Sequence, residues 1–411
     1  MQILRKYAFP LIASVSLVLL VDALTNGVTE KYLYDSNFYL GIAERGFEMD
    51  LLVAPFIYRY APSLLAGALF HLTGLSLYKI FKLITYIGVL AQLLGIFLIV
   101  HSLTCSRKSA YVGMAVVAFS MYNLKYLLFD VYRADALAYA IILLCTWLVL
   151  KGRFFPLILI TVIGLQVREF VAIPLLAFLS VQLRQEGIRK SLRYIFISLL
   201  GLFIAIGLPR LFIPIIANDQ EIKLSQEGIQ HLLNLLLYLK RDLNLVYVCF
   251  AYFLPFSIFY RPSKLKDKYR VLKAEQWSYF LHYVGWVFLL IIVGGTDMER
   301  FASYFFLPMA VSVGFLVENQ PVISIIAALF LQFIFNRIWL PFPIWDFDLF
   351  ANFYGGWSVF ITTTTIWRYV EVVTYAVLGN IILNFKNSQT KMITTLLSWK
   401  EKCNNNEEDV K

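Results

Sequence analysis

Residues 35 to 62, DSNFYLGIAERGFEMDLLVAPFIYRYAP, form the first polar break after an apolar N-terminal run. The run before the break, residues 7 to 24, is mostly apolar and is long enough to cross a bilayer as a helix. The charged side chains of the break are Asp35, Glu44, Asp50 and Arg59. We therefore expect these charges to lie at a membrane surface.

The composition of the chain is that of an integral membrane protein. Hydrophobic residues make up 60% of the 411 residues, charged residues make up only 15%, and the mean hydropathy is +0.71. A soluble domain has about 25% charged residues. Apolar segments of about 17 to 25 residues recur between short charged breaks, which is typical of a helical bundle. The sequence predicts an all-α polytopic membrane protein.

The N-terminal run follows Arg5 and Lys6, and this charge pattern is shared by signal peptides and first membrane helices. No small-residue cleavage motif follows the run, which favours a retained helix. With Arg5 and Lys6 in the cytosol, this helix delivers residues 25 to 82 to the outside as the first external loop.

The remaining apolar runs bring the expected number of transmembrane helices to about twelve. The predicted helices cover residues 7–24, 83–103, 110–127, 134–150, 154–166, 170–183, 194–214, 245–260, 277–293, 301–317, 321–336 and 361–384. In this arrangement 21 of the 36 lysines and arginines fall on the cytosolic side. The positive-inside rule favours that orientation, with both termini in the cytosol.

Residues 58 to 76 are apolar but are not counted as a span, because a span here would turn every later basic loop outward. Small or polar side chains recur at helical spacing on one face, and leucines and alanines occupy the opposite face. The small and polar positions are Arg59, Ser63, Gly67, His71 and Gly74. We predict an interfacial helix in the first external loop.

The chain is expected to form one transmembrane domain, residues 1 to 396, followed by a polar cytosolic tail, residues 397 to 411. The predicted external loops contain no Asn-x-Ser/Thr site. This absence fits a protein of the bacterial inner (plasma) membrane.

Ionisable side chains gather at the predicted external ends of the helices, whereas the cytosolic loops are mainly basic. The external set is Asp35, Glu44, Arg59, Asp130, Arg133, Asp135, Arg168, Glu169, Asp297, Glu299 and Arg300. Charged groups close to a bilayer are costly and often functional. The external end is therefore the candidate active face.

Structural roles for the same residues stay open. Asp35 is a suitable N-cap for a helix that starts at Ser36, and Arg59 could extend to lipid headgroups. Asp297 could also be a helix N-cap. Arg300 would then lie in the first turn, where a cation opposes the helix dipole, so a functional role is favoured for Arg300.

Two short motifs could form ion pairs instead of a binding site. In the first, VYRAD, Asp130, Arg133 and Asp135 could pair with one another and cap a helix. In the second, QVREF, Arg168 and Glu169 lie among apolar residues and could form a mutual or neighbouring salt bridge.

Familiar catalytic motifs are absent from the sequence: it has no Walker loop, nucleophile elbow, HExxH motif, dinucleotide-binding fingerprint or cysteine cluster. A secondary transporter normally carries polar sites or broken helices near the midplane. Here the charges gather at one face, which favours an enzyme over a transporter.

The segments YDSNFYLGIAERGF and PFIYRYAP, followed by spans with external acids and arginines, resemble the GT-C superfamily of polytopic glycosyltransferases, in particular bacterial members. The resemblance is best up to about Pro174, and the segment GGTDMERF is a weaker match later in the chain. It implies transfer of a sugar from a polyprenyl-phosphate donor to a glycan or lipid acceptor on the external face, with inversion.

The resemblance also implies roles for single residues. Asp35 matches the first-loop acid and would be the general base that accepts the proton of the acceptor hydroxyl. Guanidinium groups bind phosphate oxygens in pairs, so arginines would hold the carrier phosphate. The candidate substrate-binding residues are Arg59, Arg133, Arg168, Glu169, Asp297 and Arg300. No metal and no other cofactor is expected, and nucleic acid is not an expected partner.

Two alternatives to this function remain. A polysaccharide polymerase or ligase is also polytopic and also depends on external arginines, although it would favour larger external loops. A lipid or sugar transporter would move substrate without forming a glycosidic bond.

Overall fold

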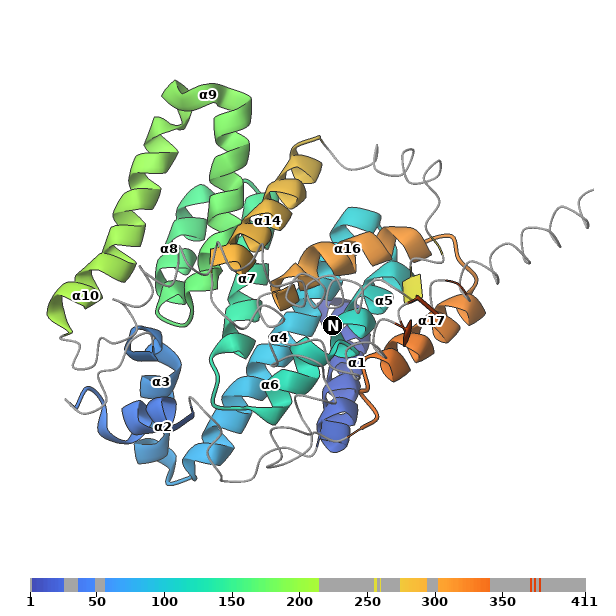
Figure 1. Cartoon of the computed structure of the whole chain (residues 1–411), viewed down its shortest axis with the longest axis horizontal. Helices are drawn as coiled ribbons and strands as arrows, with labels where there is room; N and C mark the ends of the chain where they lie inside the picture. The colour runs from blue at the N-terminus through green and yellow to red at the C-terminus, as the bar shows by residue number, and fades with distance from the viewer. Residues whose placement is uncertain are drawn as a thin grey trace, which may run out of the picture.

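The computed structural model describes residues 2–25, 36–48, 56–213, 274–293 and 302–340, with a few short pieces near residues 255–259 and 370–377. Every regular element in these ranges is a helix (Figure 1). The expected all-α architecture is therefore confirmed for the described part of the chain.

Three helical segments are long and apolar enough to cross a bilayer: Ala8–Thr25, Leu77–Thr104 and Glu169–Gly207. A bent pair, Arg107–Ala118 with Met121–Phe129, is a fourth candidate. The described chain is thus compatible with a membrane helical protein, and the count of twelve spans is not confirmed. The predicted helices 245–260 and 361–384 lie almost wholly outside the described residues.

Elsewhere the helices start and end close to the residues expected from sequence. Examples are α7 (Asp135–Leu150), α8 (Phe154–Leu165) and α14 (Ala274–Val293). By contrast, α1 (Gln2–Thr25) and α4 (Leu77–Thr104) begin five and six residues before their predicted starts. Local chemistry fixes one boundary clearly. The Ser106 hydroxyl accepts a hydrogen bond from the Ser109 backbone N–H (3.2 Å), which caps α5 (Arg107–Ala118).

The core lies around α4, which packs against α7 on one side and α5 on the other, with α16 (Phe306–Val317) against α5 (Figure 1). Lipid gives helices no hydrophobic drive to associate, so close approach depends on small residues. A Cβ at Gly88 of α4 would lie 2.8 Å from the carbonyl carbon of Ala136 in α7. The glycine lets the two backbones meet just beside Asp135.

The helix expected over residues 110–127 is broken. After α5 the chain passes through η3 (Met121–Lys125) into α6 (Tyr126–Phe129), and the two halves bend by 52°. Asn123 has a non-helical backbone and accepts a hydrogen bond from Gln92 of α4 (2.9 Å). Buried polar contacts of this kind are a known cause of helix kinks.

The predicted turn between helices 170–183 and 194–214 is present as a sharp reversal within α9 (Ile173–Leu202). Gly187 has φ 76° and ψ 171°, a conformation that is essentially restricted to glycine. The two arms of α9 run up to this point and back down (Figure 1). The second arm continues through η5 (Phe203–Gly207) into α10 (Leu208–Phe212).

A hairpin of α16 and α17 (Val322–Phe335) follows the expected turn at residues 318–321. The Nζ of Lys108 donates a hydrogen bond to the carbonyl of Gln320 (3.0 Å). The α4–α5 turn and the α16–α17 turn therefore lie at the same end of the bundle. The sequence assigns both turns to the same side of the membrane.

The first loop contains α2 (Ser36–Arg45), η2 (Phe56–Arg59) and α3 (Ala61–Thr73). The small stripe of α3 faces the protein, because Ser63 and Gly67 are fully buried or packed. On the opposite face Leu72 is 80% exposed. His71 and Gly74, the later members of the predicted stripe, are exposed, so the stripe is buried only in the first half of α3. The interfacial position of this helix stays a prediction.

Replacement of Gly67 by alanine is expected to destabilise the first loop. A Cβ at Gly67 would lie 2.2 Å from the carbonyl oxygen of Ala43, so backbone in α2 or α3 must move. Overpacking of this kind costs about 1–3 kcal/mol. The apparent Tm of purified Gly67→Ala should fall, whereas Gly285→Ala, whose Cβ meets nothing within 4 Å, should keep the wild-type Tm. Equal Tm values for both variants would contradict the packing argument.

Candidate functional site

The most buried charged pair of the described chain joins Arg168 and Asp135, each with a side chain only 1% exposed. Asp135 is the first residue of α7, and Arg168 precedes η4 (Glu169–Ala172). Arg168 Nη1 donates to Asp135 Oδ2 (3.0 Å), and Nε lies 2.9 Å from Oδ1. The hydroxyl of Tyr304 donates to the same Oδ1 (3.1 Å). Asp135 therefore has both of its oxygens engaged.

Arg168 keeps an unused donor. Its Nη2 is buried and has no hydrogen-bond partner among the described residues. Burial acts to lower the pKa of Arg168, but the Asp135 charge outweighs it and the pKa is raised. Nε also lacks a hydrogen bond of good geometry, although it lies 2.9 Å from Asp135 Oδ1. Arg168 is a permanent cation with a donor to spare.

A second pair joins Arg59 and Glu169, which are 110 positions apart in the chain. Arg59 Nε donates to Glu169 Oε2 (2.9 Å), and Nη2 donates to Oε1. Burial lowers the pKa of Arg59, but the Glu169 carboxylate raises it more strongly. The Arg59 side chain is 10% exposed and that of Glu169 is 45% exposed. This pair lies at the open edge of the site, where an incoming anion could replace Glu169.

A third pair joins Asp130 and Arg133, with side chains 4% and 5% exposed. The Arg133 guanidinium also lies over the ring of Tyr126, 5.4 Å from its centre. Ser36 donates from its hydroxyl to Asp130 Oδ1 (3.4 Å). The residue that immediately precedes Ser36 in the chain is the proposed base, Asp35.

We refer to Arg59, Asp130, Arg133, Asp135, Arg168 and Glu169 as the ion-pair cluster. Three cations and three anions make it neutral, so it has no excess charge until one pair opens. The structure brings together Arg59, Arg133, Arg168 and Glu169 of the predicted site residues. Asp35, Asp297 and Arg300 lie outside the described residues.

The structure confirms in part the ion pairs that the sequence offered as alternatives to a binding site. Asp130 does pair with Arg133. Asp135 pairs with Arg168 instead of Arg133, and Glu169 pairs with Arg59 instead of its neighbour Arg168. Arg168 has an extended backbone (φ −164°, ψ 140°), so successive side chains point to different partners.

Several tyrosines of the site were not identified from sequence. Tyr304 reaches Asp135, and the hydroxyl of Tyr39 accepts a hydrogen bond from Arg59 Nη1 (3.5 Å). Tyr139 and Ser303 share a hydrogen bond deep in the core. The only local signal was that Tyr304 follows the GGTDMERF motif and that Tyr39 lies within the YDSNFYLGIAERGF motif.

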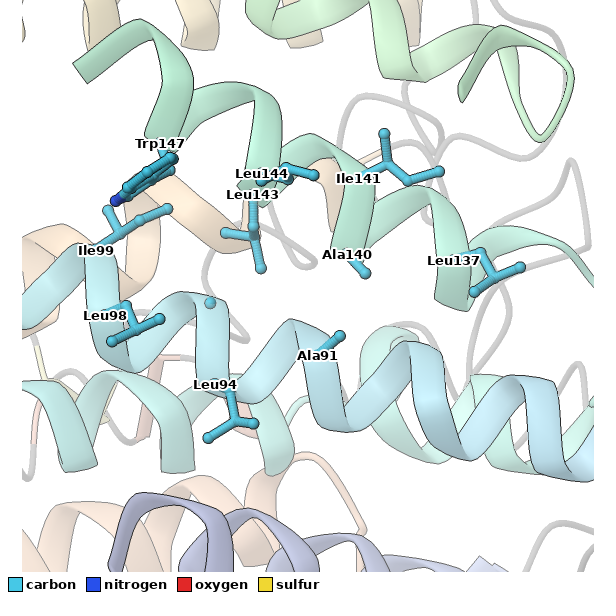
Figure 2. A pocket seen from close by; sticks show the side chains of 11 residues that line it. Ala91, Leu94, Leu98, Ile99, Leu137, Ala140, Ile141, Leu143, Leu144 and Trp147 are labelled. Carbon is cyan, nitrogen blue, oxygen red and sulfur yellow. The ribbon is translucent and has the colours of Figure 1, made fainter. Parts of the chain in front are cut away.

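An apolar groove of about 500 Å³ runs between α4 and α7. Figure 2 shows the side chains that line it, which come from these two helices. Its lining consists of Ala91, Leu94, Gly95, Leu98, Ile99, Leu137, Ala140, Ile141, Leu143, Leu144 and Trp147. On α7 the lining begins at Leu137, two residues after Asp135, and it includes no residue of the ion-pair cluster.

Within the described ranges, no group of three or more His, Cys, Asp or Glu side chains is arranged to hold a metal ion. The acids of the ion-pair cluster are each engaged by an arginine. The arrangement of the cluster is that of three ion pairs.

The resemblance to GT-C glycosyltransferases rests on three short motifs, of which residues 36–48 and 56–62 are described. It remains a prediction from those motifs. Comparison of the chain with protein-family models, with curated proteins and with solved structures found no match.

Proposed function

We propose that this chain is a membrane glycosyltransferase that transfers a sugar from a polyprenyl-phosphate donor to a glycan or lipid acceptor. The reaction takes place at the external face and inverts the anomeric carbon. The protein belongs to the bacterial inner membrane, spans it many times and keeps both termini in the cytosol.

The observation that carries the proposal is that α7 begins in the ion-pair cluster, at Asp135, and lines an apolar groove from Leu137 onward. A polyprenyl-phosphate sugar has one anionic group joined to a long hydrocarbon chain. A site for it needs a cation beside an apolar channel. Arg168, with its spare donor, and Leu137, at the head of the groove, supply these two features.

The role that we assign to each arginine follows from how exposed its side chain is. Arg59 lies at the open edge, so the donor phosphate displaces Glu169 from it and forms paired N–H···O bonds in its place. Arg168 stays bound to Asp135 and offers its Nη2 to the developing charge on the phosphate. Arg133 keeps the 130–133 turn in place beside Ser36. Arg300 and Asp297 contribute further contacts to the donor.

Asp35 accepts the proton of the acceptor hydroxyl as the hydroxyl oxygen attacks the anomeric carbon. The bond from that carbon to the phosphate oxygen breaks, and polyprenyl phosphate leaves as an anion held by the arginines. Ser36, fixed on Asp130, anchors the start of α2 directly after the base.

Filling the groove should weaken binding of the carrier lipid. Ala140→Phe places a ring among the groove side chains and removes space for two or three methylene groups, each worth about 0.8 kcal/mol when buried. Binding of polyprenyl phosphate to the protein in nanodiscs should weaken about tenfold or more. The matched control is Ile87→Phe, on an α4 side chain that is 56% exposed and outside the groove.

The same assay tests the carrier class. Polyprenyl phosphate should bind more tightly than the uncharged polyprenol, because only the phosphate engages the arginines. Equal binding of the two lipids, or equal affinity of Ala140→Phe and Ile87→Phe, would count against a carrier lipid in this groove.

A further inference from the structure

A second cavity, of about 390 Å³, lies between α9 and α14. Its lining residues are Arg184, Leu281, His282, Gly285, Trp286 and Leu289. Arg184 follows Glu169 by fifteen positions in the first arm of α9, about 20 Å at helical rise. The cavity is therefore separate from the ion-pair cluster and has no part in the transfer reaction.

The cavity exists because a glycine interrupts the contact between two antiparallel helices. The Trp286 indole N–H donates to the Ser180 hydroxyl (2.9 Å), which fixes α14 against the first arm of α9. One turn further along each helix, Arg184 and His282 line the same space. Gly285 lies between His282 and Trp286 on α14, and a Cβ there would meet nothing within 4 Å. The hollow is thus a property of this helix pair.

Arg184 is exposed and forms no ion pair within the described chain, and no carboxylate lines the cavity. It begins the basic segment RQEGIRKSLR at the reversal of α9, which also carries Arg189, Lys190 and Arg193 and only one acid, Glu186. The segment that precedes α14, RPSKLKDKYRVLK, is basic as well. Among the described lining residues, the positive charge of Arg184 therefore attracts anions.

Apolar side chains border the charged lining. Leu281 is 52% exposed and Leu289 is 45% exposed, so the cavity opens among side chains that suit lipid chains. His282 Nδ1 lies 2.7 Å from the Ser278 carbonyl and therefore carries the proton there. In the neutral ring, Nε2 remains as an acceptor for a hydroxyl group.

We propose that this cavity binds the headgroup of an anionic phospholipid that carries a free hydroxyl, as phosphatidylglycerol does. Arg184 holds the phosphodiester, His282 accepts the headgroup hydroxyl, and the acyl chains lie along Leu281 and Leu289. Basic pockets between membrane helices on the cytosolic side are a recurring form of lipid recognition. This proposal is independent of the proposed transfer reaction.

The test measures the apparent Tm of the delipidated full chain in detergent against increasing phosphatidylglycerol, which gives an apparent Kd. Wild type should be stabilised by phosphatidylglycerol and not by phosphatidylcholine or inorganic phosphate. Arg184→Ala should bind phosphatidylglycerol about fivefold more weakly, because one arginine near an anionic lipid contributes about 1 kcal/mol. Gly285→Leu, which fills the hollow, should abolish the stabilisation.

The control is Arg189→Ala, an exposed arginine of the same segment that does not line the cavity. It should bind like wild type. Equal Kd values for Arg184→Ala and Arg189→Ala would overturn the site, as would stabilisation by inorganic phosphate alone. If Gly285→Leu does not fold, the comparison of the two arginine variants decides.

Phosphatidic acid lacks the hydroxyl of phosphatidylglycerol and tests the His282 contact. Wild type should bind phosphatidic acid more weakly than phosphatidylglycerol, whereas His282→Ala should bind the two lipids equally. Equal binding of the two lipids to wild type would exclude the His282 contact.

Discussion

Asp135→Asn should lower the stability of the protein by about 3–5 kcal/mol, the cost of leaving one partner of a buried ion pair uncompensated. Arg168 is 1% exposed and cannot lose its proton. The charge of Glu169 also acts on it, but within the described ranges only the Asp135 carboxylate lies at ion-pair distance. The substitution would leave its full positive charge in an apolar interior. The measurement is the apparent Tm of the purified protein by intrinsic fluorescence.

Removal of the whole pair separates its structural role from its function. Replacing a buried ion pair by apolar residues of similar volume is often neutral or stabilising. Asp135→Leu combined with Arg168→Met should therefore recover most of the lost Tm, with Tyr304→Phe added so that the Tyr304 hydroxyl keeps no unpaired donor. Binding of polyprenyl phosphate should be weaker in this triple variant than in wild type, because the arginine is gone.

The control for charge removal is Glu48→Gln. The Arg45–Glu48 pair spans 3.2 Å with side chains 43% and 51% exposed, so its loss should cost less than about 1 kcal/mol. A wild-type Tm for Asp135→Asn would contradict the view that Arg168 depends on this carboxylate. Full lipid binding by the apolar variant would remove Arg168 from the proposed site.

Asp35→Asn should abolish sugar transfer while leaving folding and membrane insertion intact. An amide has nearly the shape of the carboxylate but cannot accept the proton of the acceptor hydroxyl. Loss of a general base typically costs about 10²–10⁴-fold in rate. The initial rate of sugar transfer, with the elution profile of the protein as a folding check, gives the result.

Glu44→Gln is the matched control for Asp35→Asn, since Glu44 is an exposed acid of the same loop. It should transfer at the wild-type rate. Near-normal transfer by Asp35→Asn would exclude Asp35 as the base, and an equal loss in both variants would point to the charge of the loop instead of a proton acceptor.

Much of the helical framework follows from patterns within single segments. The turn between residues 183 and 194 was predicted because the basic segment RQEGIRKSLR interrupts an apolar run there, and the structure places the reversal at Gly187. The break between α5 and η3 was not predicted, because Asn123 leaves the helix to bond Gln92, a residue 31 positions away. A polar side chain in an apolar run does not reveal whether its partner is near enough to bend the helix.

The site shows the same limit. The alternating direction of successive predicted helices assigned Arg59, Arg168 and Glu169 to the same, external end of the bundle. The structure places these three residues together. Their partners could not be predicted, because the contacts span 33 and 110 positions and depend on how α7 and α8 meet the first loop. Neighbouring opposite charges, Arg168 and Glu169, appeared to be natural partners, yet the extended backbone at Arg168 separates them.

The most direct test of the proposed function is release of free polyprenyl phosphate by the purified protein in nanodiscs, supplied with a panel of polyprenyl-phosphate sugars and candidate acceptors. The proposal predicts release with at least one donor, in step with a new glycosidic bond, and no release by Asp35→Asn. No release from folded wild-type protein with any donor, or counterflow of labelled substrate without a new bond, would contradict a transferase.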